Sequence, residues 1–428
     1  MCLYSIRDRD SEVLTSTALH VIIHTGRYMI VGTRNASAHL FCGSLIDGSG
    51  GPIQQRVLVG IKDSIITSID REYDRKYLPP GTIDWSNCTL LPGLVDCHVH
   101  LFMSGTANPA VRSSQLHYTF TEARPIIAGH LSDQIRHGII ALRDGGDYGG
   151  HALRFKREGM QGMRSPVLIS CAGRAWHASG RYGRLIGRPP EDNLSLAQSI
   201  ASDAESPDHI KIVNSGINSL TEFGKETRPQ FSLQELMKAV KTTEHLGLKA
   251  MVHANGRLPV DAAAQAGCHS IEHGYFMGKD NLTLLADRSI YWVPTAYPMK
   301  AYTGLAKKGS VEANIALKNL DHQLNQIRLA REFGVPMAIG TDCGSLGVHH
   351  GEAFSEEMRL FVEAGCTIPE VVRVATANGA QLIGIEHETG EFKVGMPATF
   401  VILKGTPTAL FDSLKLPERV YFKGIRLA

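Results

Sequence analysis

The sequence predicts an α/β protein in which a (β/α)8 TIM barrel carries a small β-sandwich domain formed by both chain ends. Three observations lead to this fold class: β-branched runs at both ends of the chain, eight apolar runs across its middle, and helix signals between those runs. Eight strand–helix units over about 290 residues match a TIM barrel in number and length. A doubly wound open sheet is the alternative.

The first predicted domain joins residues 1–90 with residues 386–428. Its N-terminal β-branched runs, separated by Gly, Asp and Asn turns, are HVIIHTG, RYMIVGT, AHLFCGSLIDGSGGPI, RVLVGIKDSIITSID and CTLLPG. The same pattern returns near the C-terminus in ATFVILKG and RVYFKGIRLA. Because strand-rich ends flank a different middle, we expect them to pair in one small β-sandwich domain.

Residues 91–385 are the predicted barrel domain. Its eight candidate strands, in chain order, are GLVDCHVH, IIALRD, PVLISC, HIKIV, LKAMVH, HSIEH, IYWVPT and PMAIGTD. Helix signals lie between them. Ser232 opens SLQE, a capping box that predicts a helix ending by Gly247. Thr367 opens TIPE, a second capping box, and predicts a helix running towards Gly384.

The composition indicates a soluble protein that binds neither nucleic acid nor a membrane. A hydrophobic content of 43% and a charged content of 20% are ordinary for a globular chain. The net charge of +2 and the lack of a basic run with aromatics argue against nucleic acid. Eight scattered cysteines without a CxxC pair are typical of a reducing compartment. The polar N-terminus MCLYSIRDRDSEVL and the lack of a run of ~20 apolar residues lead us to expect a cytoplasmic protein and no membrane partner.

Side chains that can bind a metal ion lie at the carboxyl ends of five predicted strands. In strand order they are His98, His100, Lys211, His253, His273 and Asp342. In a parallel barrel these strand ends meet at one mouth, where barrel enzymes keep their active sites. His98 and His100 are two residues apart, so both imidazoles point to the same side of the strand. A single strand histidine is more often structural, but packing does not explain the whole set, and imidazole with carboxylate suits Zn²⁺.

The motifs LPGLVDCHVH, HIKIV, MVHANG, SIEHG and AIGTDCG resemble the successive metal motifs of the amidohydrolase superfamily. Members of that superfamily are metal-dependent hydrolases on a distorted TIM barrel, and the resemblance covers nearly the whole chain. It is strongest to the binuclear branch. Within that branch it points to the cluster of imidazolonepropionase-related amidohydrolases, Xaa-Pro and Xaa-Arg dipeptidases and ochratoxinase-like amidases.

The resemblance implies two divalent metal ions as cofactors, with Zn²⁺ as the expected metal. His98, His100 and Asp342 would hold the more buried ion. His253 and His273 would hold the second ion. The expected partner is therefore a small-molecule amide substrate, either an N-acyl amino acid, a dipeptide-like compound or a cyclic amide.

Lys211 and Asp342 carry the chemistry that the resemblance implies. Lys211 would be carbamylated by CO₂, which turns the amine into an anionic bridge between the ions. An ammonium beside two metal ions is repelled, whereas a neutral amine can react. A hydroxide bridging the two metals would attack the scissile carbonyl. Asp342 would accept the proton and deliver it to the leaving nitrogen.

Substrate-binding residues should come from the loops that follow the strands. His177, after the third strand, is the candidate contact to the tetrahedral oxyanion. Asn255 lies two residues past His253 and could face the mouth by strand parity. Tyr275 lies two residues past His273 and could face the mouth for the same reason. These three residues are the predicted substrate contacts.

Two other functions stay open. One is deamination of a heterocycle by the same superfamily, although mononuclear deaminases generally lack the lysine at the position of Lys211. The other is a non-catalytic scaffold, although such paralogues have typically lost ligands that are all present here. Arg143 and Asp144 are interpreted as a structural ion pair, and His209 receives no role. The sequence does not fix the oligomeric state, so a homo-oligomer stays open.

Overall fold

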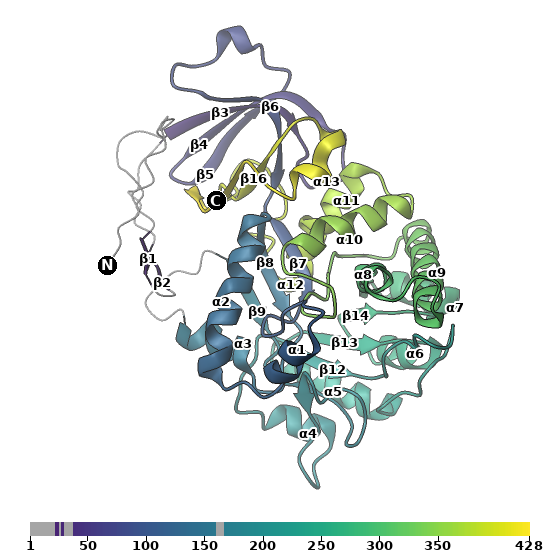
Figure 1. Cartoon of the computed structure of the whole chain (residues 1–428). Coiled ribbons are helices and arrows are strands. Elements are labelled where there is room, and N and C mark those ends of the chain that lie inside the picture. Colours follow the sequence, from purple (N-terminus) through teal and green to yellow (C-terminus); the bar gives the residue numbers. More distant parts are fainter. Residues whose placement is uncertain (1–21, 25–26, 30–36, 160–166) are drawn as a thin grey trace.

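The computed structural model describes residues 22–24, 27–29, 37–159 and 167–428. In this part the protein has an α/β fold, with a mixed sheet at one end and a larger body of parallel strands and helices (Figure 1). MCLYSIRDRDSEVL lies outside the described residues, as do parts of HVIIHTG and RYMIVGT. The described parts of those two runs, β1 (Ile22–His24) and β2 (Arg27–Met29), pair antiparallel.

Both chain ends contribute to one mixed sheet with the strand order β18-β17-β16-β6-β3-β4-β5. Its strands are β3 (Ser37–Leu45), β4 (Gln54–Lys62), β5 (Ile65–Asp70), β6 (Ile83–Pro92), β16 (Phe400–Lys404), β17 (Arg419–Phe422) and β18 (Ile425–Arg426). The two-residue turn between β4 and β5 has positive φ at Asp63 and Ser64, as hairpin turns require. β16 joins the two ends, because it pairs antiparallel to β6 with Val401 opposite Leu91.

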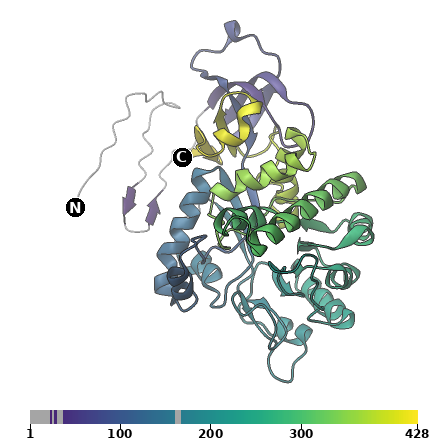
Figure 2. The ribbon, with the colours of Figure 1, turned by 45° about the vertical axis from the view of Figure 1, so that its right-hand side comes forward.

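This sheet has a hydrophobic core of its own. Leu40, Val59 and Leu90 from the N-terminal strands pack with Phe400 and Ile402 of β16. Their spacing of two residues along each strand places them on one face of the sheet. The two ends of the chain are therefore held together by packing as well as by hydrogen bonds. Figure 2 shows this sheet against one end of the larger body.

The larger body contains two parallel sheets. One has the order β7 (Leu94–Val99), β8 (Ile139–Asp144) and β9 (Leu168–Cys171). The other has the order β11 (Gly187–Arg188), β10 (Ala175–Trp176), β12 (Ile210–Val213), β13 (Ala250–Ala254), β14 (Ser270–His273) and β15 (Tyr291–Val293). These strands are buried almost throughout, which explains their continuous apolar runs. Seven of the eight predicted strands are present: β7, β8, β9, β12, β13, β14 and β15.

The eighth predicted strand, PMAIGTD, is not a regular strand in the described structure. Residues 336–342 run between β15 and β7 and share only isolated parallel bridges with these neighbours. The Trp292 amide donates to the Pro336 carbonyl at 2.8 Å, and the Asp342 amide donates to the His98 carbonyl at 2.8 Å. The Ile339 amide donates to the Val374 carbonyl of α11 (Ile368–Ala375) at 3.3 Å instead of to a neighbouring strand, which interrupts the ladder.

Helices separate the strands and lie mainly outside them (Figure 1). They are α1 (Pro109–Gln115), α2 (Phe120–Arg136), α3 (His151–Arg154), α4 (Leu196–Ala201), α5 (Leu233–His245), α6 (Arg257–Gln265), α7 (Gly278–Asp287), α8 (Tyr297–Leu305), α9 (Val311–Phe333), α10 (Glu352–Glu363), α11 (Ile368–Ala375), α12 (Ala377–Ile383) and α13 (Leu410–Ser413). The predicted capping boxes at Ser232 and Thr367 are confirmed. The helix predicted to reach Gly384 is divided into α11 and α12 at Thr376, whose φ of −133° and ψ of −83° are not helical. No helix in the described ranges is long and apolar enough to cross a membrane.

Candidate metal centre and active site

Four predicted histidines lie together at the carboxyl ends of the parallel strands. The ring centroids of His98 and His100 are 5.5 Å apart, and those of His98 and His273 are 4.9 Å apart. The ring centroid of His253 is 4.6 Å from that of His273. β12 brings Lys211 to the same place, with its Nζ 3.5 Å from Nε2 of His98. Strands far apart in the sequence therefore bring these five side chains together.

Asp342 completes a set of donor atoms that fits a metal ion. Its Oδ1 lies 3.6 Å from Nε2 of His98 and 3.4 Å from Nε2 of His100. The other ring nitrogens are engaged, since Nδ1 of His98 donates to Glu272 at 2.7 Å and Nδ1 of His100 donates to the Gly146 carbonyl at 2.8 Å. In the neutral form of each ring, the proton on Nδ1 leaves Nε2 with a lone pair that can bind a metal ion. One ligand atom from each of His98, His100 and Asp342 lies within 4.8 Å of the others, so a divalent cation would relieve the repulsion between them.

Glu272, which sequence reasoning missed, fixes the orientation of His98. Its fully buried carboxylate accepts hydrogen bonds from His98 Nδ1 and Arg143 Nη2, both at 2.7 Å. Ser270 Oγ donates to it at 2.5 Å. Although burial raises the pKa of Glu272, Arg143 and His98 hold that pKa well below its ordinary range. The available signal was a lone glutamate in an apolar strand, two residues from Ser270 and so on the same face.

The expected Arg143–Asp144 ion pair is wrong. Arg143 pairs with Glu272 because alternate residues of β8 point to opposite faces. The Asp144 carboxylate instead accepts backbone N–H bonds from Leu101 at 2.8 Å and Gly146 at 2.9 Å. Asp144 therefore holds the loop that follows His100, while Arg143 faces the centre.

Burial favours the neutral form of His98, His253 and Lys211, whereas Asp342 raises the pKa of His100 against the effect of burial. Burial lowers the pKa of His98 to about 4 and the pKa of His253 to about 3, and Lys211 acts in the same direction on both. Burial also lowers the pKa of Lys211 to about 8, helped by Arg143 and opposed by Glu272. Neutral imidazoles are the form that binds metals, and a neutral amine is the form that reacts with CO₂.

Asp342 is held ionised and in a strained backbone conformation. Burial raises its pKa, but the hydrogen bond to His100 and the rings of His98 and His273 hold that pKa well below the ordinary range. Its φ is 54°, which is uncommon for a residue other than glycine and is often found at functional sites. Ser345 Oγ donates to Oδ2 at 2.9 Å, so the two carboxylate oxygens have different partners.

The three predicted substrate contacts have different surroundings. His177 is buried, its Nδ1 lies 2.9 Å from the Ala178 carbonyl oxygen, and its Nε2 has no hydrogen-bond partner among the described residues. Asn255 Oδ1 accepts from the Tyr275 amide at 3.1 Å, and the Tyr275 hydroxyl lies 3.4 Å from the Thr295 carbonyl oxygen. Asn255 and Tyr275 therefore join the loops around the centre. Their contact with substrate stays a prediction.

Tyr182 lies closer to the centre than sequence reasoning anticipated. Its ring centroid is 5.5 Å from that of His253. Burial, together with the charge of Asp342, raises the pKa of Tyr182, so the phenol stays protonated and can donate a hydrogen bond. The residue belongs to an irregular loop, where no strand or helix period shows which way a side chain points.

Arg112 is a third residue that sequence reasoning missed. Its Nη1 donates to the carbonyls of Ser104 and Gly344, both at 3.0 Å, and so joins the loop after β7 to the loop after Asp342. Burial lowers the pKa of Arg112, and the negative charge of Asp342 opposes this effect only in part. This guanidinium therefore lies within electrostatic reach of the centre.

Comparison with known proteins agrees with the class of protein that the parallel strands and the histidine–aspartate set define. The sequence pattern of the amidohydrolase family matches residues 89–425. The chain therefore belongs to the amidohydrolase family, and it is a hydrolase acting on carbon–nitrogen bonds.

Individual relatives cover most of the chain at low identity. Ochratoxinase of Aspergillus niger is 26% identical over 423 residues, covering 89% of this chain and 84% of the relative. Imidazolonepropionase of Aliivibrio salmonicida is 24% identical over 383 residues, covering 80% of this chain and 84% of the relative. A crystal structure of a Xaa-Pro dipeptidase with methionine bound in its active site has a TM-score of 0.77 and 25% identity, covering 92% of this chain and all of the other.

Proposed function

We propose that this chain is a binuclear metal-dependent amidohydrolase that cleaves an amide bond in a small molecule. The substrate would be an N-acyl amino acid, a dipeptide-like compound or a cyclic amide. The observation that carries the proposal is the convergence of two histidine Nε2 atoms on Asp342 Oδ1 while both Nδ1 atoms are engaged elsewhere. The similarity to a dipeptidase structure supports an amide as the scissile group.

The proposal includes the predicted barrel. Residues 172–174 connect β9 to β10, so one chain segment passes from the first parallel sheet into the second. Residues 336–342 lie between β15 and β7. If β9 and β10 count as one strand, the eight strand positions of a (β/α)8 barrel over residues 91–385 would be filled. They would be β7, β8, β9 with β10, β12, β13, β14, β15 and residues 336–342. Residues 1–90 and 386–428 would form the accessory sandwich domain.

Six side chains would hold two ions. The donor atoms of His98, His100 and Asp342 fit the first ion, and His253 with His273, whose ring centroids are 4.6 Å apart, would hold the second. Nε2 of His253 donates to the Gly216 carbonyl at 3.1 Å, which leaves its Nδ1 free to bind. Zinc is the expected metal because it favours imidazole and carboxylate ligands. When bound, such ions lower the pKa of a water molecule and polarise the scissile carbonyl.

The sixth side chain, Lys211, would supply the bridge as a carbamate. In its neutral form, Nζ would form a bond to the carbon of CO₂ and release one proton to solvent, and the resulting anionic carbamate would supply oxygen ligands for the ions. Asp342 would accept a proton from the attacking water and return it to the leaving nitrogen. Because Oδ1 faces the histidines, Oδ2 is the atom that would carry this proton. His177 and Tyr182 are the candidates for a hydrogen bond to the substrate carbonyl oxygen.

The test is hydrolysis of N-acyl amino acids and dipeptides by the zinc-loaded protein, compared with Asp342→Asn. Asparagine keeps an oxygen ligand but cannot carry the proton, so we expect turnover to fall by about a hundredfold or more while KM changes little. Zinc content is measured on both proteins. No hydrolysis by zinc-loaded wild type, or near-wild-type turnover in the variant with zinc bound, would contradict the proposal. A cytoplasmic location and a homo-oligomer remain predictions.

A further inference from the structure

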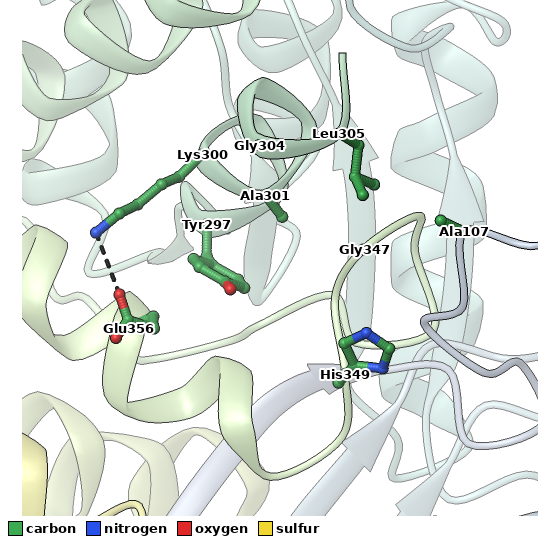
Figure 3. Close-up of a pocket in the computed structure, with 9 residues that line it drawn as sticks. All are labelled: Ala107, Tyr297, Lys300, Ala301, Gly304, Leu305, Gly347, His349 and Glu356. Atoms are coloured by element: carbon green, nitrogen blue, oxygen red, sulfur yellow. Dashed lines mark hydrogen bonds and ion pairs between the residues drawn. The ribbon is translucent and has the colours of Figure 1, made fainter. Parts of the chain in front are cut away.

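A hollow of about 340 Å³ lies between α8, α10 and the loop after Asp342 (Figure 3). Ala301, Leu305 and Tyr297 of α8 line one side. His349 lies on the other side, and Ala107 comes from the loop after β7. Lys300 extends away from Leu305 towards Glu356 of α10.

The loops that build this hollow are the loops that carry the candidate metal centre. The segment that contains His349 begins at Asp342, whose carboxylate accepts from Ser345 at 2.9 Å. The Gly347 amide donates to the Gly105 carbonyl at 2.8 Å, which ties this segment to the loop after β7. α8 begins two residues after Thr295, whose hydroxyl lies 2.6 Å from Nδ1 of His273. The hollow is therefore built by the loops that follow Asp342 and β7 and by the helix that follows Thr295, next in sequence to residues of the candidate centre.

The lining of the hollow favours an uncharged apolar group. Lys300 Nζ already pairs with Glu356 at 3.2 Å and with Glu363 at 3.8 Å. Two carboxylates against one ammonium leave no positive charge to hold an anionic substrate group. The remaining surface consists of small or aliphatic side chains with the rings of Tyr297 and His349, which suit an apolar chain or ring.

We propose that this hollow binds the apolar side chain of the amide substrate and so determines which amides the enzyme accepts. The inference rests on the proposed function, because it assumes that the neighbouring centre holds the scissile amide. An apolar group on the acyl arm and one on the amine arm of that amide present the same chemistry to the hollow, and the test below distinguishes them.

Gly304 of α8 offers a way to fill the hollow. It lines the cavity, and a Cβ added there would meet no atom within 4 Å. Gly304→Phe should therefore fold and place a ring in the space. Gly129 of α2 is the matched control, because it is also helical and a Cβ there also meets no atom within 4 Å. Gly129→Phe makes the same chemical change outside the hollow.

Three amides distinguish the two arms of the substrate: N-acetyl-L-phenylalanine, with its ring on the amine arm, N-benzoylglycine, with its ring on the acyl arm, and N-acetylglycine, with no ring. Dissociation constants for the zinc-loaded proteins are measured by calorimetry, and hydrolysis is followed separately. We expect Gly304→Phe to weaken binding of one ring-bearing amide by about tenfold or more. Binding of N-acetylglycine, and all binding by Gly129→Phe, should change by less than about twofold.

Each result decides the inference. Wild-type affinity of Gly304→Phe for both ring-bearing amides would overturn it, as would a wild-type protein that binds neither of them. If these amides are hydrolysed but Gly304→Phe has no effect, the hydrolase proposal stands and the inference fails. If Gly304→Phe selectively weakens binding of a ring-bearing amide but no amide is hydrolysed, the hollow is an apolar binding site, while the proposed function and the selection of amides for cleavage both fail.

Discussion

Glu272 and the Gly146 carbonyl occupy Nδ1 of His98 and of His100, so both Nε2 atoms face Asp342. The orientation of each ring depends on these partners as much as on the backbone that carries it. Carboxylates that orient metal-binding histidines in this way commonly affect metal affinity. At the scale of single residues, the candidate centre therefore extends to Glu272 and to Arg143, which holds it.

Glu272→Gln should weaken zinc binding about tenfold to a hundredfold. The amide NH₂ of glutamine would face a donor, either His98 Nδ1–H or Arg143, and the negative charge opposite Arg143 would be lost. Affinity is measured by chelator competition on folded protein, with folding checked by circular dichroism. Glu357→Gln is the control, because Glu357 is also buried but bonds to backbone amides of α8. A folded Glu272→Gln protein with wild-type zinc affinity would show that Glu272 has no such role.

The side chains predicted from the sequence were those whose position in a strand determined their direction. The two-residue period of β7 placed His98 and His100 on one side, and the structure confirms that their rings are neighbours. Tyr182 and Arg112 could not be found in that way, because one lies in an irregular loop and the other in a short helix after β7. Glu272 lies at a strand position that faces the centre, but its role depends on contacts with β7 and β8, which its position in the sequence does not reveal.

Glu357 connects two helices beside the centre. Its carboxylate accepts from the amides of Ala296 at 2.9 Å and Tyr297 at 2.6 Å, at the start of α8. These bonds favour the ionised form, but burial has the larger effect and raises the pKa of Glu357 to about 8. An unfolded glutamate has a pKa of about 4.3, so the folded state binds a proton more tightly than the unfolded state does.

Glu357 should therefore make stability fall as the pH rises. A raised pKa in the folded state stabilises it fully below about pH 4.3, and this contribution is lost as the pH rises through the folded-state pKa. Glu357→Gln removes the titration. We expect the unfolding free energy of wild type minus that of the variant to decrease from about pH 5 to about pH 9, as measured by urea denaturation. A difference that stays constant or increases would show that the backbone bonds outweigh burial.

Among the elements, those with strong local signals were predicted well. The capping boxes at Ser232 and Thr367 start helices α5 and α11 as expected. The division between α11 and α12 was missed because it depends on one buried residue, Thr376, whose hydroxyl donates to the Val372 carbonyl at 2.7 Å. The eighth strand was predicted but is not regular, because its hydrogen bonding depends on distant segments such as α11, which cannot be read from its own residues.

In the described part of the molecule, strands from residues 37–92 and 400–426 meet in one sheet, and the candidate centre lies in the body between them in sequence. β6 ends at Pro92 and β7 begins at Leu94, so the chain passes from the sheet of the chain ends into the parallel strands within two residues. The change in residue pattern along the chain led us to expect pairing between the N-terminal and C-terminal strands, and β16 pairs with β6. The single seven-stranded sheet could not be predicted, because strand order depends on pairing between distant segments.

The central claim is that Lys211 bridges two metal ions, and zinc content measures it most directly. The wild-type protein, purified with zinc, should carry about two ions per chain by mass spectrometry of the metal. Lys211→Ala should lose zinc and activity, and short carboxylic acids should restore part of both by replacing the anionic bridge. One ion per chain in the wild type, or full activity with unchanged zinc in Lys211→Ala, would contradict the account.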